Sequence, residues 1–147
     1  METKAITDQV LVGGQPNGDE LQELASQGVA AVINLREANE DDDPTSSRDE
    51  ALRVQQLGMT YVNSPVGLAQ LDSFHLNTFR AKLNLLPKPV YVHCSNGQRA
   101  TALALASLGI TEQWTSEEAL SRADEIGCDC HGPLRNFVAE QIAERNS

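Results

Sequence analysis

One stretch of the chain constrains its fold more than any other: an apolar run of strand length passes through a short polar loop directly into a helix. The run Val90–His93 ends at Cys94, the loop holds Gly97 and Arg99, and Ala100–Leu108 follows with helix-forming residues. A strand that leads straight into a helix is the unit from which parallel sheets are built. In such sheets ligands bind at the carboxyl ends of the strands, and Cys94 falls at such an end.

The rest of the chain alternates between strands and helices in the same way. The near-continuous apolar run Val29–Leu35 predicts a buried central strand, and Val10–Val12 and Met59–Asn63 predict two more. We expect a first helix that is capped by Asn17 and ends at Ser26. Four more helices are expected: from about Arg48 to Leu57, from Asp72 or Ser73 to about Leu86, after Thr115, and after Gly132. We expect one three-layer α/β domain over residues 1–147, with a mostly parallel sheet of four to five strands flanked by helices.

The loop after Cys94 has the composition of an anion cradle. Its backbone N–H groups and the start of the following helix carry partial positive charge and point at one spot, which favours the thiolate form of the cysteine. Gly97 permits a turn that a Cβ would obstruct, and Arg99 offers a planar guanidinium to an oxyanion. We expect Cys94 to be a nucleophile and Arg99 to clamp the anion. We expect the backbones of four residues to form the cradle: Ser95, Asn96, Gly97 and Gln98.

Two polar residues outside this loop are candidates for supporting roles. His93 is expected either to orient the loop by hydrogen bonding or to be a satisfied histidine of the core. Arg36 ends the central strand, and we expect it to lie near the site or to pair with a carboxylate of the acidic segment Arg36–Ser47. That segment is expected to be a solvated loop and not a metal site.

Charge and hydropathy limit the partners of this chain. A formal net charge of -10 over 147 residues argues against nucleic acid and against anionic membranes. No apolar run approaches the roughly 20 residues of a membrane span, and the first residues lack the apolar core of a signal peptide. We expect a cytoplasmic location, no cofactor and a small anionic substrate, with a protein substrate also possible.

Two of the three cysteines lie outside the loop, in Cys128-Asp129-Cys130-His131. An odd number of cysteines without a secretory signal fits a reducing compartment. The Cys-x-Cys spacing is shorter than structural zinc sites use, so no metal is expected. The two thiols either have no role or act on Cys94 as a resolving partner.

Several of these pieces together resemble a known family, the phosphatase-like domain of beta-lactamase hydrolase-like proteins, which is related to dual-specificity and tyrosine phosphatases. The matching pieces lie between about residues 6 and 126: Gly14-Gln15-Pro16, Ile33-Asn34-Leu35-Arg36, Pro89-Val90, and His93-Cys94 with Gly97 and Arg99. The resemblance implies a protein-tyrosine-phosphatase-like fold and a phosphocysteine intermediate on Cys94, with Arg99 gripping the phosphoryl group.

The sequence departs from the tyrosine phosphatase pattern in three places. Four residues separate Cys94 from Arg99 where tyrosine phosphatases have five, and Cys-x4-Arg is the loop length of rhodanese-like sulfurtransferases. Ala100 stands where phosphatases usually have Ser or Thr, and the hydroxyl of Thr101 is expected to point elsewhere because a helix turns about 100° per residue. Tyrosine phosphatases use an aspartic acid to protonate the leaving oxygen, and Asp72 is the candidate for this acid here. The role of a helix N-cap fits Asp72 better. The acidic run 40–43 is a weaker candidate for the acid.

Three functions follow from these observations. Overall resemblance favours hydrolysis of phosphoesters through Cys94. The loop length and the lack of an assured acid favour a second function, sulfur transfer from thiosulfate or a persulfide through a persulfide on Cys94. A third possibility is a non-catalytic anion-binding domain, against which the intact set of Cys94, Gly97 and Arg99 argues.

Overall fold

Five short strands form one sheet in the computed structural model, which describes residues 3–37, 47–126 and 132–146. The strands are β1 (Thr3–Ala5), β2 (Val10–Gly13), β3 (Ala31–Asn34), β4 (Thr60–Asn63) and β5 (Val90–His93). Their order across the sheet is β1-β2-β5-β3-β4; β1 pairs antiparallel with β2 and all other pairs are parallel. The expected mostly parallel sheet is confirmed. The sequence did not indicate β1, a three-residue edge strand with mostly exposed side chains.

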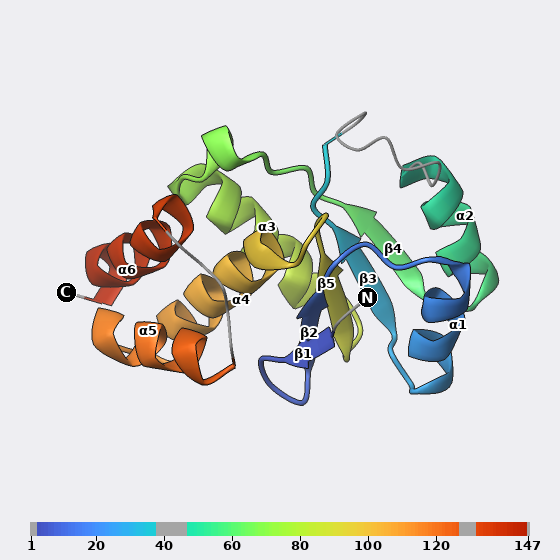
Figure 1. Ribbon diagram of the computed structural model, residues 1–147, viewed down its shortest axis with the longest axis horizontal. Coiled ribbons are helices and arrows are strands. Elements are labelled where there is room, and N and C mark those ends of the chain that lie inside the picture. The colour runs from blue at the N-terminus through green and yellow to red at the C-terminus, as the bar shows by residue number, and fades with distance from the viewer. Residues whose placement is uncertain (1–2, 38–46, 127–131, 147) are drawn as a thin grey trace.

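Helices cover both faces of the sheet, which gives three layers (Figure 1). The helices are α1 (Gly18–Ser26), α2 (Ser47–Gln56), α3 (Ser73–Leu85), α4 (Gln98–Thr111), α5 (Ser116–Glu125) and α6 (Pro133–Asn146), with a 3-10 turn η1 (Leu68–Gln70) between β4 and α3. α1 and α2 lie on one face, α3 and α4 lie on the other, and α5 and α6 pack beyond α4.

α1, α3 and α5 each begin at a short polar side chain that caps the helix. The Asn17 Oδ1 atom accepts a hydrogen bond from the Glu20 N–H at 2.8 Å, and the Glu20 carboxylate accepts one from the Asn17 N–H at 2.9 Å. Thr115 and Glu118 form the same reciprocal box at the start of α5. A cap of this kind contributes about 1 kcal/mol to helix stability, so these signals are strong enough to read from sequence.

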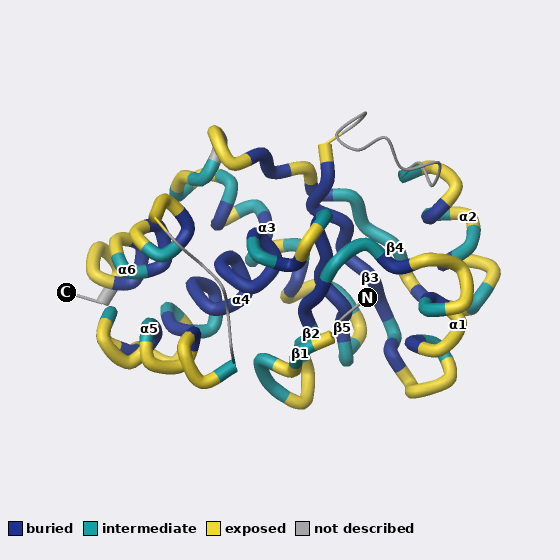
Figure 2. The backbone as a smooth tube through the Cα atoms, in the orientation of Figure 1, coloured by how far each residue is buried: buried dark blue, intermediate teal, exposed yellow. Residues whose placement is uncertain are grey.

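Two apolar cores lie on the two sides of the sheet. The larger one joins the sheet to α3–α6, and the smaller one joins it to α1 and α2. Figure 2 shows α4 buried along most of its length, whereas the other helices expose an outer face. This burial explains why Ala100–Leu108 carries only small or apolar side chains. No helix within the described ranges is long and apolar enough to cross a membrane.

The parallel pairing brings the ends of three strands together at one edge of the sheet. Gly13, Asn34 and His93 are register partners at the ends of β2, β3 and β5. Cys94 follows directly and therefore lies in the middle of this edge. The predicted strand 29–35 is longer than the observed strand β3, which covers Ala31–Asn34. A run of apolar residues indicates burial, but it does not show which of its residues pair with a neighbouring strand.

Candidate active site

The loop between β5 and α4 turns sharply at Gly97. This residue caps α4 with φ +90°, a left-handed conformation that residues with a Cβ seldom adopt. A Cβ at this position would lie 3.1 Å from the carbonyl carbon of Gly13. Gly97 therefore meets both a conformational and a packing requirement of the loop, as the sequence predicted for its turn.

One backbone N–H and one side-chain oxygen of the loop lie near the sulfur of Cys94. The Gly97 N–H donates to Sγ at 3.1 Å, and the Asn96 Oδ1 atom lies 3.9 Å from Sγ. The same Oδ1 atom accepts from the Gln98 N–H at 3.1 Å, which fixes the Asn96 side chain. The side chain of Cys94 is buried. A buried sulfur that accepts a backbone N–H at a helix start is in a setting that stabilises a thiolate.

The loop is also held from the side of β2. The Gln15 N–H donates to the Ser95 carbonyl at 3.2 Å, and the Tyr91 hydroxyl donates to the Gly14 carbonyl at 2.6 Å. Burial, with a smaller effect of nearby negative charges, raises the pKa of Tyr91 above its ordinary value. The hydroxyl therefore keeps its proton and remains a donor. The cradle is built by two segments that lie about 80 residues apart in sequence.

Arg99 lies in the first turn of α4 and is 8% exposed. One guanidinium nitrogen donates to the Val66 carbonyl at 3.0 Å, and another lies 3.4 Å from the Ser95 Oγ atom. Beside it opens a pocket of about 360 Å³. The pocket is lined by Glu37, Gly67, Leu68, Ser95, Asn96, Gln98, Arg99 and Leu134. Cys94 itself is buried and is not among these lining residues.

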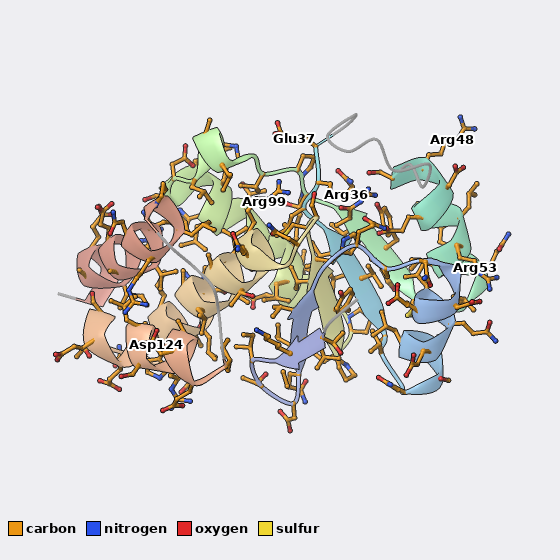
Figure 3. The ribbon with its side chains drawn as sticks, in the orientation of Figure 1. Arg36, Glu37, Arg48, Arg53, Arg99 and Asp124 are labelled. Carbon is orange, nitrogen blue, oxygen red and sulfur yellow. The ribbon has the colours of Figure 1, made fainter. Side chains whose placement is uncertain are left out.

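Glu37 is the carboxylate among the described residues that line this pocket. Its side chain reaches Gly67, where an added Cβ would overlap the carboxylate. Figure 3 shows Glu37 and Arg99 above the carboxyl ends of the strands, with Arg36 beside them. The sequence reasoning missed Glu37 as a site residue, although a signal was present: Glu37 follows β3 by three residues, and the ends of neighbouring parallel strands gather at one edge.

The structure places Asp72 as the N-cap of α3 and not in the pocket lining. Its Oδ1 atom accepts from the His75 N–H at 2.9 Å and lies 2.7 Å from His75 Nδ1. The hydrogen bond from the His75 N–H, before any other cause, lowers the pKa of Asp72 below its ordinary value. An ionised, capping carboxylate is a poor proton donor, and the N-cap is the role that fitted Asp72 better from the sequence.

His93 and Arg36 meet at a buried carboxylate that the sequence did not single out, Glu50 of α2. His93 Nε2 lies 2.6 Å from Glu50 Oε2, and an Arg36 guanidinium nitrogen lies 3.7 Å from Glu50 Oε1. Among the described residues, Glu50 on α2 is therefore a carboxylate partner of Arg36. Glu50 and Val54 are the buried residues of α2, so a glutamate one turn from a buried valine was the available signal.

The remaining predictions about the site concern Thr101, the two other cysteines with the acidic run, and metal binding. The Thr101 hydroxyl donates to the Gly97 carbonyl at 2.7 Å, so it is turned away from the sulfur as predicted. Cys128 and Cys130, with the acidic run 40–43, lie outside the described residues. Within the described ranges, no group of three or more His, Cys, Asp or Glu side chains is placed to hold a metal ion.

Solved structures with the same architecture define the class of this protein. A candidate phosphatase from Shewanella putrefaciens CN-32 matches with a TM-score of 0.79 at 25% identity, covering 99% of this chain and 93% of its own. A candidate phosphatase from Neisseria meningitidis Z2491 matches with a TM-score of 0.81 at 19% identity, covering 94% and 96%. The fold is protein-tyrosine-phosphatase-like, as the sequence predicted.

The family follows from the sequence comparison. A family model described as "Beta-lactamase hydrolase-like protein, phosphatase-like domain" matches residues 2–110, and the chain belongs to this family. Two relatives named beta-lactamase hydrolase-like protein, from Xylella fastidiosa strains Temecula1 and 9a5c, are 26% identical over 129 residues and 27% identical over 124 residues. These matches cover 88% and 84% of this chain but 30% and 29% of the relatives. The comparisons support a phosphatase-type function.

Proposed function

We propose that this protein is a cysteine-dependent phosphatase that hydrolyses phosphomonoesters through a phosphocysteine on Cys94. The observation that carries the proposal is the Gly97 N–H directed at Cys94 Sγ at 3.1 Å, at the start of α4 and in the fold of the tyrosine phosphatases. Arg99, in the first turn of the same helix, supplies the positive charge that a phosphoryl group needs. Family membership supports the same chemistry.

The reaction proceeds in two displacements at phosphorus. The Cys94 thiolate attacks phosphorus, the ester P–O bond breaks, and the departing oxygen takes a proton. Water then attacks the phosphocysteine, the S–P bond breaks, and the thiolate is restored as phosphate leaves. Arg99 and the loop N–H groups stabilise the equatorial oxygens in both steps. Because Arg99 donates to the Val66 carbonyl, we expect a bound phosphoryl group to draw the guanidinium toward the sulfur.

We propose Glu37 as the group that protonates the leaving oxygen and accepts the proton of the attacking water. Its carboxylate lines the same pocket as Arg99, while Asp72 caps α3. A positioned acid contributes about 10²–10⁴-fold to the rate. Glu37→Gln should therefore slow hydrolysis of an alkyl phosphate by about 10²-fold or more and of p-nitrophenyl phosphate by less, since nitrophenolate leaves without help. Asp72→Asn is the matched control and should leave both rates unchanged.

The pocket favours a substrate with an apolar group next to the phosphate. Leu68, which is 62% exposed, and Leu134 form an apolar part of its wall. One structural neighbour, TpbA of P. aeruginosa, was solved with phosphotyrosine at a TM-score of 0.67 and 15% identity, covering 96% of this chain. We propose aryl phosphates, including phosphotyrosine, as the preferred substrates. A higher kcat/KM for phosphotyrosine than for phosphoserine tests this preference.

Sulfur transfer is the second candidate, and one observation favours it. Four residues separate Cys94 from Arg99, the loop length of rhodanese-like proteins, and the Thr101 hydroxyl is committed to the Gly97 carbonyl. A paired assay separates the two functions: phosphate release from p-nitrophenyl phosphate beside thiocyanate formation from thiosulfate and cyanide, with Cys94→Ser as the blank. Cys94-dependent phosphate release supports the proposal, and thiocyanate formation without phosphate release refutes it. Absence of both with intact binding of inorganic phosphate would indicate the non-catalytic anion-binding domain.

A further inference from the structure

A second cavity lies at the end of the sheet that faces away from Cys94. Val10 begins β2 at the amino ends of the parallel strands, and it lines this cavity together with residues of the β1–β2 turn, α3 and α4. Figure 1 shows this turn at the end of the sheet away from the loop between β5 and α4. The cavity volume of about 330 Å³ falls within the range of about 300–1,000 Å³ that small-molecule sites occupy. We propose that this cavity binds a small organic cation, a primary ammonium group on an apolar chain.

The apolar part of the wall suits the chain of such a ligand. Ile6, Val10 and Leu108 are partly buried and pack against the larger core. Leu83 and Ala104 belong to that core and also line the cavity. An apolar chain in the cavity would remove the remaining exposed surface of these side chains from water, which is favourable. The apolar wall therefore supplies binding free energy without fixing the polar group of the ligand.

A buried hydroxyl in the same wall calls for a polar partner. Ser107 lines the cavity and is 6% exposed. Its carbonyl accepts from Thr111 Oγ1 at 3.1 Å, but its hydroxyl has no hydrogen-bond partner among the described residues. A buried polar group without a partner is disfavoured. A ligand group that hydrogen-bonds the Ser107 hydroxyl would therefore be held more tightly than an apolar group in the same place.

The exposed part of the lining carries negative charge. Asp8 of the β1–β2 turn and Glu112, the C-cap of α4, both line the cavity. Neither carboxylate has an ion-pair or hydrogen-bond partner within the described ranges. The carboxyl end of α4 adds the negative end of a helix dipole. An ammonium group combines the N–H donors that Ser107 lacks with the charge that the two carboxylates favour.

Lys88 is the cation among the described lining residues, and its ammonium group is already bound. Its Nζ atom donates to the Leu83 carbonyl at 2.6 Å and to the Leu86 carbonyl at 2.8 Å. These bonds hold the end of α3, so they direct the lysine at the protein backbone. The two carboxylates therefore outweigh this single charge, and the net charge of -10 on the chain acts in the same sense. An ammonium ligand is favoured over a carboxylate ligand.

The test compares three probes that share one chain and differ in the head group: octylamine, octanol and octanoate, each below its micelle concentration. A ¹H–¹⁵N NMR titration of the wild-type protein reports where each one binds. We expect octylamine to give saturable shifts at the amides of Thr7, Ser107 and Glu112, with a Kd about tenfold or more below that of octanoate. Tighter binding of octanoate, or octylamine shifts confined to the loop 95–99, would overturn the proposal.

Two matched double variants test the role of the carboxylates. Asp8→Asn with Glu112→Gln should weaken octylamine about tenfold and leave octanol unchanged. Asp19→Asn with Glu23→Gln removes the same two charges from the exposed face of α1 and should leave both affinities at their wild-type values. Equal octylamine affinity in the two double variants would contradict the proposal.

Ser107→Ala tests the hydroxyl separately. Because this hydroxyl has no partner among the described residues, the variant should melt no lower than the wild type. We expect its octylamine affinity to fall about tenfold, and an unchanged affinity would refute the role of Ser107. All of these readouts are binding measurements away from Cys94, so they hold whether or not the protein releases phosphate.

Discussion

Replacing Gly97 by alanine should damage the loop that holds Cys94. The residue has φ +90°, and the new Cβ would lie 3.1 Å from the Gly13 carbonyl carbon and 3.3 Å from its Cα. Both atoms belong to the end of β2, which is hydrogen-bonded to β5 and cannot easily move. Gly28 offers a matched control, because it has φ +95° but nothing within 4 Å of an added Cβ.

The two substitutions should differ in their effect on the free energy of unfolding by the amount that steric crowding costs at Gly97. A left-handed backbone costs an L residue about 1–2 kcal/mol, and alanine recovers about 0.4–1 kcal/mol by restricting the unfolded chain. Gly28→Ala should therefore cost less than about 1.6 kcal/mol. Crowding adds about 1–3 kcal/mol at Gly97, so we expect a loss of about 1–5 kcal/mol there. At about 3 °C per kcal/mol for a chain of this length, Gly97→Ala should lower Tm by about 3–15 °C.

Thermal denaturation and p-nitrophenyl phosphate hydrolysis check this prediction together. Gly97→Ala should lose activity well below its Tm, because the added methyl moves the Gly97 N–H away from Cys94 Sγ. Gly28→Ala lies far from the loop in sequence and should keep wild-type rates. Equal melting temperatures and equal rates for the two variants would refute the argument that close approach to Gly13 fixes the cradle.

Three further predictions follow from the described contacts. The His75 N–H lowers the pKa of Asp72 below 3.8, so this cap contributes stability above about pH 4 that is lost as the pH falls through the lowered pKa; the Tm of Asp72→Asn should be less sensitive to acid in that range than the wild-type Tm. Tyr91→Phe leaves the Gly14 carbonyl without its donor and should cost about 1–2 kcal/mol in urea denaturation, and an unchanged midpoint would contradict this. Arg99→Lys removes the guanidinium fork and should lower kcat about 10²-fold or more at an unchanged fold, and a wild-type kcat would exclude Arg99 as the clamp.

The parts of the molecule that the sequence predicted are those with local signals. The N-caps at Asn17 and Thr115 bond to residues three positions away, and the turn at Gly97 lies within the loop that it shapes. The carboxyl end of β5 was also predictable. An apolar run that is followed by Gly97 and a helix-forming segment can adopt few structures other than a strand that leads into a helix. For the same reason the position of Cys94 followed from the sequence.

The parts that were not predicted depend on contacts between distant residues. Glu50 meets His93 across 43 positions and Gln15 across 35, and Glu37 lies against Gly67 across 30. Nothing in the local sequence of α2 shows which buried ring its glutamate will face. The N-cap role of Asp72 was predicted, by contrast, because its carboxylate accepts from a residue only three positions away.

The most direct test of this account is to trap the intermediate. The wild-type protein would be mixed with p-nitrophenyl phosphate, quenched in acid within the first turnovers, digested and analysed by mass spectrometry, with Cys94→Ser treated in parallel. The account predicts a peptide that contains Cys94 and carries the mass of one phosphoryl group, together with no turnover in Cys94→Ser. Continued phosphate release by Cys94→Ser would contradict it.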